Sequence, residues 1–331
     1  MLVALLSLAA VSVRAQDPQI RETRPNVKVL KDLHESELFL EMNFVADALG
    51  VHCDYCHVKN DTKWVWADDS KPTKAKGRQM MTMVAGLNAS SFNGTTRVTC
   101  FTCHRGSLEP ARLVPLPPIE SAERTGQRPP ETLPTAQQII DRYLAAIGAH
   151  RDDPVKAMRI TGVIERSENR KDTFELSILG EENARITVTT ADGIVEQTLE
   201  GKSSTLRAKD KVTELPPAAY ERFRRSIAMY APIKVRDSVE QMKVTGTEVI
   251  DGRKTYVVQS GPARKLYFDA TSSLLVRDLR ITETVFVPLL DQIDYSDYRA
   301  AGGVKMPFVI RTSNVAPYDT ATRRIREMKF E

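Results

Sequence analysis

Two copies of one short motif constrain this chain more than any other feature of its sequence. Residues 53–57 read Cys-Asp-Tyr-Cys-His and residues 100–104 read Cys-Phe-Thr-Cys-His, and together they use all four cysteines of the 331-residue chain. In this spacing, two thiols one helical turn apart can each bond to a vinyl group of the same porphyrin, and the histidine that follows can bind its iron. The motifs predict two covalently bound haem c groups, held by Cys53, Cys56, Cys100 and Cys103, with His57 and His104 as proximal ligands.

Zinc and disulfide bonds are the other roles that two pairs of cysteines can take. Zinc would use both Cys-x-x-Cys pairs as its four ligands, and an oxidising compartment would allow disulfides. Neither role gives a reason for a histidine to follow each pair directly, whereas haem attachment does. Haem is therefore the preferred interpretation.

A helix carrying methionine is predicted before each motif. From Glu35 to Leu49 apolar residues recur at helical spacing, and Gly50 is well placed to end that helix. A second helix is predicted to begin at Lys71-Pro72-Thr73 and to run to about Asn88. The same order of elements thus occurs twice in the chain: a helix, then a turn or loop, then Cys-x-x-Cys-His. This repetition indicates an internal duplication.

The methionines of these helices are candidate distal ligands of the two irons. Methionine on an apolar stripe is usually a core residue, but each haem needs a sixth ligand or an open site, and a thioether is a common ligand. Met42 is the only methionine near the first motif. For the second haem, Met80, Met81 and Met83 compete, and spacing alone does not choose among them.

Residues 36–110 resemble the haem-binding units of photosynthetic reaction centre cytochrome c subunits. The similarity runs from Met42-Asn43 through Leu49-Gly50-Val51 into the first motif, and from Arg78-Gln79-Met80 through Met83, Asn88 and Val98-Thr99 into the second motif and Arg105-Gly106. In that family a methionine on the helix before the motif is usually the distal ligand. The resemblance therefore implies Met42 for the first haem and Met80 for the second, with Met83 as the alternative.

The chain departs from the pattern of that family in two respects. The reaction centre subunit binds four haems and is commonly lipid-anchored, whereas this chain has two motifs and no cysteine near its start. One haem of the family takes a distant histidine in place of methionine, so His34 and His52 are further candidate ligands here. The resemblance implies a shortened dihaem relative that relays electrons, and it does not imply photosynthesis.

The first 15 residues predict export. They are apolar from Leu2 to Val13 and offer small side chains before Gln16, so we expect a signal peptide that is cleaved near Ala15-Gln16 and a periplasmic protein. Haem c is attached outside the cytoplasm in bacteria, which agrees with that expectation. The formal net charge of +4 could suggest nucleic acid as a partner, but the expected compartment argues against it.

Basic residues outnumber acidic ones around the motifs. Between Lys59 and Arg112 there are nine Lys or Arg and four Asp or Glu. This surplus predicts a redox partner protein that is acidic or membrane-bound, because opposite charges steer encounters. The alternative is a solvated surface that balances the haem propionates. The aromatic residues Tyr55, Trp64, Trp66 and Phe101 are expected to shield the porphyrins from water.

The composition changes after the second motif. Residues 107–134 contain seven prolines and predict a semi-rigid linker. A capping box at Thr135 and Gln138 then begins an amphipathic helix that ends before Gly148. From Met158 onwards apolar residues alternate, and Asp192-Gly193, Asp251-Gly252 and Gly302-Gly303 predict hairpins, with a helical insertion at 217–229.

These patterns predict a multi-domain chain. A signal peptide (1–15) precedes a mostly α, c-type dihaem cytochrome domain (16–106), the linker (107–134) and an α+β domain with a curved antiparallel sheet, a half-barrel (135–331). The last part weakly resembles lipoprotein-carrier half-barrels, which hold acyl chains in an apolar concavity. The sheet could therefore bind a hydrophobic ligand, or it could be a rigid docking module whose core is filled by its own side chains. We expect an electron carrier and not an enzyme; a haem enzyme with an open, peroxidase-like iron and a hydrophobic-ligand carrier are the alternatives.

Overall fold

The N-terminal part of the chain folds into a small helical unit. The computed structural model describes residues 17–112, 132–149, 157–166, 170–180, 182–215, 220–221, 223–224, 227, 239–284, 286–314 and 320–330. The expected signal peptide and residues 113–131 of the expected linker lie outside this set. The helical unit contains α1 (Ile20–Thr23), α2 (Glu35–Leu49), η1 (Cys53–Tyr55), β1 (Val58–Asn60), β2 (Lys63–Val65), α3 (Pro72–Ser91) and α4 (Cys100–His104).

The sequence signals for α2 and α3 correspond to what is observed. α2 ends at Gly50, whose φ of 66° is the left-handed conformation that glycine adopts at no steric cost. α3 begins with Pro72 in its first turn, where a missing N–H costs nothing. The expectation of a mostly α unit holds only in part, because a β1–β2 hairpin with Trp64 paired to Lys59 separates the two helices.

The C-terminal part is built around one large antiparallel sheet. α5 (Ala136–Ile147) precedes it, with the predicted Thr135–Gln138 capping box in place. Its strands are β3 (Met158–Arg166), β4 (Lys171–Ile178), β5 (Asn183–Thr190), β6 (Gly193–Glu200), β7 (Ser203–Ala208), β8 (Lys211–Glu214), β9 (Met242–Ile250), β10 (Arg253–Ser260), β11 (Arg264–Asp269), β12 (Leu275–Glu283), β13 (Pro288–Ala301), β14 (Val304–Asn314) and β15 (Ala321–Phe330).

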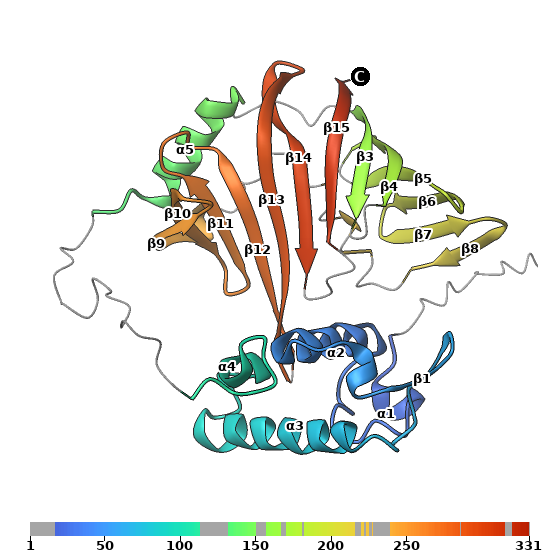
Figure 1. Cartoon of the computed structure of the whole chain (residues 1–331). Coiled ribbons are helices and arrows are strands. Elements are labelled where there is room, and N and C mark those ends of the chain that lie inside the picture. The colour runs from blue at the N-terminus through green and yellow to red at the C-terminus, as the bar shows by residue number, and fades with distance from the viewer. Residues whose placement is uncertain are drawn as a thin grey trace, which may run out of the picture.

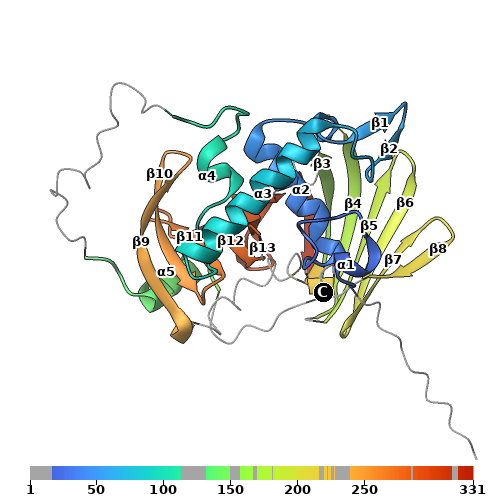
Figure 2. The ribbon, with the colours of Figure 1, turned by 90° about the horizontal axis from the view of Figure 1, so that it is seen from below.

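The strand order shows that the sheet is continuous and has two open edges, β8 and β9. Within the described residues the order is β8-β7-β6-β5-β4-β3-β15-β14-β13-β12-β11-β10-β9, so two meanders join where β3 pairs with β15. The sheet curves without closing, as Figures 1 and 2 show. The three predicted hairpins connect β5 to β6, β9 to β10 and β13 to β14. In the predicted insertion, residues 220, 221, 223, 224 and 227 are helical.

One face of the sheet packs on α5 and forms the main hydrophobic core. Ile140 and Ile147 of α5 are buried together with Leu176, Leu266 and Phe268 of the strands, and Phe223 and Ile227 of the insertion join them. The ring of Tyr143 meets that of Phe268 edge to face at 5.4 Å between centroids. On this face, the described apolar side chains of the strands, α5 and the insertion therefore bury one another.

The β12–β13 connection joins the sheet to the helical unit. It reaches the end of α2, below the sheet in Figure 1, and buries Phe286, Val287 and Leu289 in a cluster with Leu33 and Ala48. The Thr284 hydroxyl contacts the carboxylate of Glu41 and accepts hydrogen bonds from the N–H groups of Phe286 and Val287, at 3.2 and 3.1 Å. Because Glu41 is fully buried, its pKa is raised to about 7.

Among the described residues, no helix is both long and apolar enough to cross a membrane.

We predict that Phe286→Ala destabilises the helical unit, although Phe286 lies in the connection between β12 and β13. Phe286 is 3% exposed, and removing a buried aromatic ring costs about 3–5 kcal/mol in transfer and cavity terms. Denaturant unfolding of the full chain, followed by tryptophan fluorescence from Trp64 and Trp66, measures the effect. Leu290→Ala, at a site 41% exposed on β13, is the control and should change little; equal effects of the two variants would contradict the prediction.

Candidate cofactor-binding site

The first Cys-x-x-Cys-His motif is a tight turn fixed to the start of α3. Within it, the N–H groups of Cys56 and His57 donate to the Cys53 carbonyl at 3.3 and 2.9 Å. The Thr73 hydroxyl donates to the Tyr55 carbonyl at 2.6 Å, and the Lys71 ammonium contacts the Asp54 carbonyl. Two thiols in one such turn can face the same side, as a shared porphyrin requires.

His57 is held in a partly buried aromatic corner. Its ring lies edge-on to Trp66, with 5.1 Å between centroids, and Trp66 stacks on Trp64 at 4.7 Å. Burial, followed by the positive charge of Lys74, lowers the pKa of His57. Both effects favour the neutral imidazole, which is the form that binds a metal.

A buried lysine holds this corner together. The Lys74 ammonium donates to the carbonyls of Trp66 and Asp68, both at 2.7 Å, and lies 2.9 Å from the carboxylate of Asp69. Asp69 also binds Arg78 at 2.9 Å, and these two cations hold its pKa far below the usual range. The network joins α3 to the segment that carries Trp66, so it fixes the ring beside His57.

The second motif is the short helix α4, placed by the end of α2. Its capping box joins Thr99 and Thr102, whose hydroxyl accepts from the Thr99 N–H at 3.0 Å. The Gly106 N–H donates to the Ala48 carbonyl at 2.9 Å. Any Cβ at Gly50 would collide with the Gly106 carbonyl oxygen, so both the turn and this close approach require glycine.

His104 is oriented in the manner of a metal-binding histidine. Its Nδ1 lies 3.0 Å from the carbonyl oxygen of Ser107. With the proton on Nδ1, this hydrogen bond fixes the ring and leaves Nε2 as the ligand atom, which is the usual arrangement of metal-bound imidazole. His57 lacks such a bond in the described residues, where its buried Nδ1 has no partner.

Asn88 fixes the loop that leads into the second motif. Its buried side chain accepts from the N–H groups of Arg97 and Val98 at 3.0 and 2.9 Å and donates to the Val98 carbonyl at 2.8 Å. Val98 is two residues before Cys100, so one amide on α3 positions the chain at the entry to α4.

The structure places the candidate methionines at different depths. Met42 is half-buried and packs against the cluster that contains buried Cys100 and Met81. Met80 is half-buried, and Met83 is 48% exposed. Among these methionines of α3, Met81 is thus the one in the core cluster, while Met80 and Met83 are outside it. The assignment of Met80 as the distal ligand stays a prediction.

The structure divides the candidate cysteines and histidines between separate places. Cys53 and Cys56 lie in the turn beside α3, and Cys100 and Cys103 lie on α4 beside α2. No group of three or more His, Cys, Asp or Glu among the described residues is arranged to hold a metal ion. His34 begins α2, where its Nδ1 pairs with the Asp17 carbonyl at 2.8 Å, and His52 is exposed.

Several functional contacts were not anticipated from the sequence. The packing of Trp66 on His57, the buried ammonium of Lys74 and the Asn88 clamp depend on tertiary positions. A signal did exist for Gly50 and Gly106, since a glycine after a helix and another two residues after the second histidine both suggest a special backbone conformation.

The helical unit is similar to proteins of known role. Residues 4–136 match the family model of the photosynthetic reaction centre cytochrome C subunit. The cytochrome c subunit of the photosynthetic reaction centre from Thermochromatium tepidum is 32% identical over 156 residues, which are 44% of this chain and 36% of that one. The corresponding subunit of Rubrivivax gelatinosus is 36% identical over 102 residues, 29% of this chain and 26% of the relative.

Cytochrome c-554 of Chloroflexus aurantiacus is a further relative, 34% identical over 89 residues, which are 25% of this chain and 20% of that protein. This chain therefore matches about a third or less of the length of each of these relatives. The resemblance deduced for residues 36–110 is confirmed.

A solved structure resembles the larger part of the chain only distantly. The match to the LolA superfamily protein NE2245 from Nitrosomonas europaea covers 60% of this chain and 94% of that protein, with a TM-score of 0.40 and 12% identity. The likeness of the sheet to lipoprotein-carrier half-barrels stays a prediction.

We predict that Asn88→Ala loosens the second motif. Three hydrogen bonds to Arg97 and Val98 would be lost, and leaving buried backbone groups unpaired costs about 1–3 kcal/mol. Hydrogen exchange of the amides at 97–98, together with thermal unfolding, measures the change. Ser91→Ala, at an exposed site on the same helix, is the control; protection at 97–98 that survives in Asn88→Ala would refute the assignment.

Proposed function

We propose, from the relationship of residues 4–136 to photosynthetic reaction centre cytochrome c subunits, that this chain is an exported dihaem c-type cytochrome that transfers electrons between redox partners. The observation that supports this most directly is the orientation of His104. His104 directly follows a Cys-x-x-Cys pair, and its Nδ1 is hydrogen-bonded to the backbone carbonyl of Ser107. Its Nε2 is therefore the nitrogen that is available for iron.

The residues of the two motifs fit covalent haem. Cys53 and Cys56 would hold one group and Cys100 and Cys103 the other, each through two thioethers. His57 and His104 would be the proximal ligands, and Met42 and Met80 are the proposed distal ones, with Met83 as the alternative to Met80. When bound, haem c supplies an iron that takes up and gives back one electron.

The protein contributes rigidity, shielding and charge to electron transfer. The Lys74 network and the Asn88 clamp hold the two motifs in place, so little rearrangement need accompany a change of charge. Trp66 and Trp64 cover His57 on one side and limit its contact with water. Because the relatives of residues 4–136 are cytochrome c proteins, we propose an electron carrier.

The partner and the compartment are part of the proposal. Lys59 and Lys63 are exposed on the β1–β2 hairpin, next to the Trp64–Trp66 stack. Such a surface favours an acidic partner protein, because opposite charges raise the rate of encounter in a salt-dependent way. The periplasm is the expected compartment. Haem c is attached outside the cytoplasm in bacteria, and the apolar first residues have the pattern of a signal peptide.

We predict two covalent haems per chain. Expression with a cytochrome c maturation system, followed by intact mass and absorption spectra, counts them. Replacing Cys100 and Cys103 by Ser should leave one haem, and replacing Cys53 and Cys56 should leave the other. A colourless exported protein, or one that contained zinc or disulfides, would overturn the proposal; a reduced protein that binds carbon monoxide at once would favour the haem-enzyme alternative.

We predict that Met80→Leu removes the distal ligand of the second haem, whereas Met81→Leu does not. Leucine cannot bind iron, so the sulfur-to-iron charge-transfer band of one haem should disappear in the Met80 variant and the potential of that haem should fall. The Met81 variant keeps the volume of a buried side chain and should cost less than about 1.5 kcal/mol of stability. Met83→Leu completes the series, and loss of the band in that variant alone would move the ligand to Met83.

A further inference from the structure

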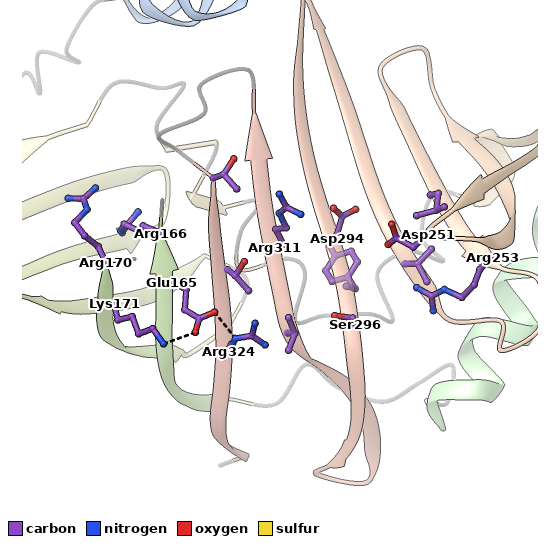
Figure 3. Close-up of a pocket in the computed structure, with 16 residues that line it drawn as sticks. Glu165, Arg166, Arg170, Lys171, Asp251, Arg253, Asp294, Ser296, Arg311 and Arg324 are labelled. Carbon is purple, nitrogen blue, oxygen red and sulfur yellow. Dashed lines mark hydrogen bonds and ion pairs between the residues drawn. The ribbon is translucent and has the colours of Figure 1, made fainter. Parts of the chain in front are cut away.

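The sheet face that turns away from α5 carries a polar groove. In a β-strand successive side chains point to opposite faces, so Asp294 and Arg311 face away from the core formed by their neighbours Ile293 and Ile310. The groove has a volume of about 810 Å³ and spans β3, β15, β14, β13 and β12, with the β9–β10 turn at one side (Figure 3). That volume lies within the range of small-molecule sites.

Basic residues outnumber acidic ones in the lining of the groove, and two of the basic ones, Arg166 and Arg253, also pair with Asp172 and Asp269 outside it. Its lining contains six basic residues and three acidic ones, listed here: Arg166, Arg170, Lys171, Arg253, Arg311 and Arg324 against Glu165, Asp251 and Asp294. Two of the three acids, Glu165 and Asp294, form ion pairs with arginine or lysine side chains. Glu165 binds Arg324 at 2.7 Å and Lys171 at 3.4 Å, as the dashed lines of Figure 3 show.

Asp294 is occupied by residues on its other side. Its carboxylate accepts from Arg277 at 2.6 Å and from Gln292 at 2.8 Å. Arg311 lies directly across the strand pair from Asp294, yet no ion pair joins Arg311 to any side chain in the described part of the chain. The central strand of the groove thus presents a guanidinium whose charge is not matched by a bonded carboxylate.

The surroundings of Arg311 suit an anion with several oxygens. Arg311 is the direct cross-strand neighbour of Thr322, and Arg324 is paired with Val309, so the two arginines are diagonal neighbours on one face. Diagonal neighbours in a sheet lie about 7–8 Å apart, a span that one anion can bridge between two long side chains. The bond from Arg324 to Glu165 uses its Nε, which leaves its two terminal nitrogens for a ligand.

Hydroxyl donors and an apolar wall complete the site. Ser296, Thr320 and Thr322 line the groove beside the arginines. Arginine forks and hydroxyl groups together are the donors that bind phosphate oxygens. Ile250, Val276 and Val309 add apolar surface that could cover the body of an organic molecule.

We propose that this groove binds a phosphate group, carried by a soluble organic molecule or by a lipid headgroup, with Arg311 as the central contact. The site is separate from the haem motifs and does not depend on their role. It gives the sheet a binding function on the face that its own core leaves open.

The experiment compares Arg311→Gln with a matched control in the full-length, haem-loaded chain. Arg207→Gln makes the same change on β7, outside the groove, at a side chain 64% exposed. Radiolabelled inorganic phosphate in equilibrium dialysis tests the soluble source. Sedimentation with phosphatidylcholine vesicles, with and without phosphatidylglycerol, tests the lipid source.

We expect Arg311→Gln to weaken binding about tenfold or more, because a hydrogen bond to a charged group is lost, and Arg207→Gln to leave it unchanged. Arg311→Lys should give an intermediate loss, since it keeps the charge without the fork. Binding of phosphate identifies a soluble ligand, and binding only to phosphatidylglycerol vesicles identifies a headgroup. Absence of both, or equal losses in the two glutamine variants, would overturn the proposal; unchanged melting temperatures exclude a folding defect.

Discussion

The contact between the end of α2 and the second motif is the constraint on which the helical unit depends. Gly50 turns the chain in a left-handed conformation, and the Gly106 backbone lies so close that no side chain fits between them. The Ala48 carbonyl accepts from the Gly106 N–H in the same place. The helix that precedes the first motif thereby supports the second motif, so the two motif-bearing segments are interlocked and are not independent of each other.

Local signals in the sequence were sufficient to place most of the elements. Pro72, the Thr135 cap and the Gly after α2 and α5 act within one turn of the chain, and the Asp-Gly and Gly-Gly pairs set the hairpins of the sheet. The candidate haem ligands could be proposed for the same reason, since Cys-x-x-Cys-His is a local pattern, and they stay a prediction. What could not be predicted depends on tertiary contacts. Examples are the hydrogen bond from the Lys74 ammonium to the Trp66 carbonyl and the contact of the Thr284 hydroxyl with the Glu41 carboxylate.

The two faces of the sheet have different physical characters. Under α5 the face is apolar, with Leu176, Leu266 and Ile310 fully buried. The other face carries charged side chains in cross-strand rows, among them Asp294 opposite Arg311. The first face thus presents apolar side chains, whereas the second carries an open polar groove. Period-two alternation predicted that two faces exist, but the pairing register decides which charges meet.

The contact between Thr284 and Glu41 joins residues 243 positions apart, and this has a consequence for the order of events during synthesis. Both haem motifs leave the ribosome long before Phe286 and Val287, which complete the apolar cluster around Ala48 and Cys100. The helical unit of the nascent chain is therefore unfinished, and the cluster around Cys100 is still open, until the β12–β13 connection has been synthesised. Once the β12–β13 connection is synthesised, its apolar side chains complete the cluster. A late segment of the sheet is therefore required to bury the core of a unit that is encoded near the start of the chain.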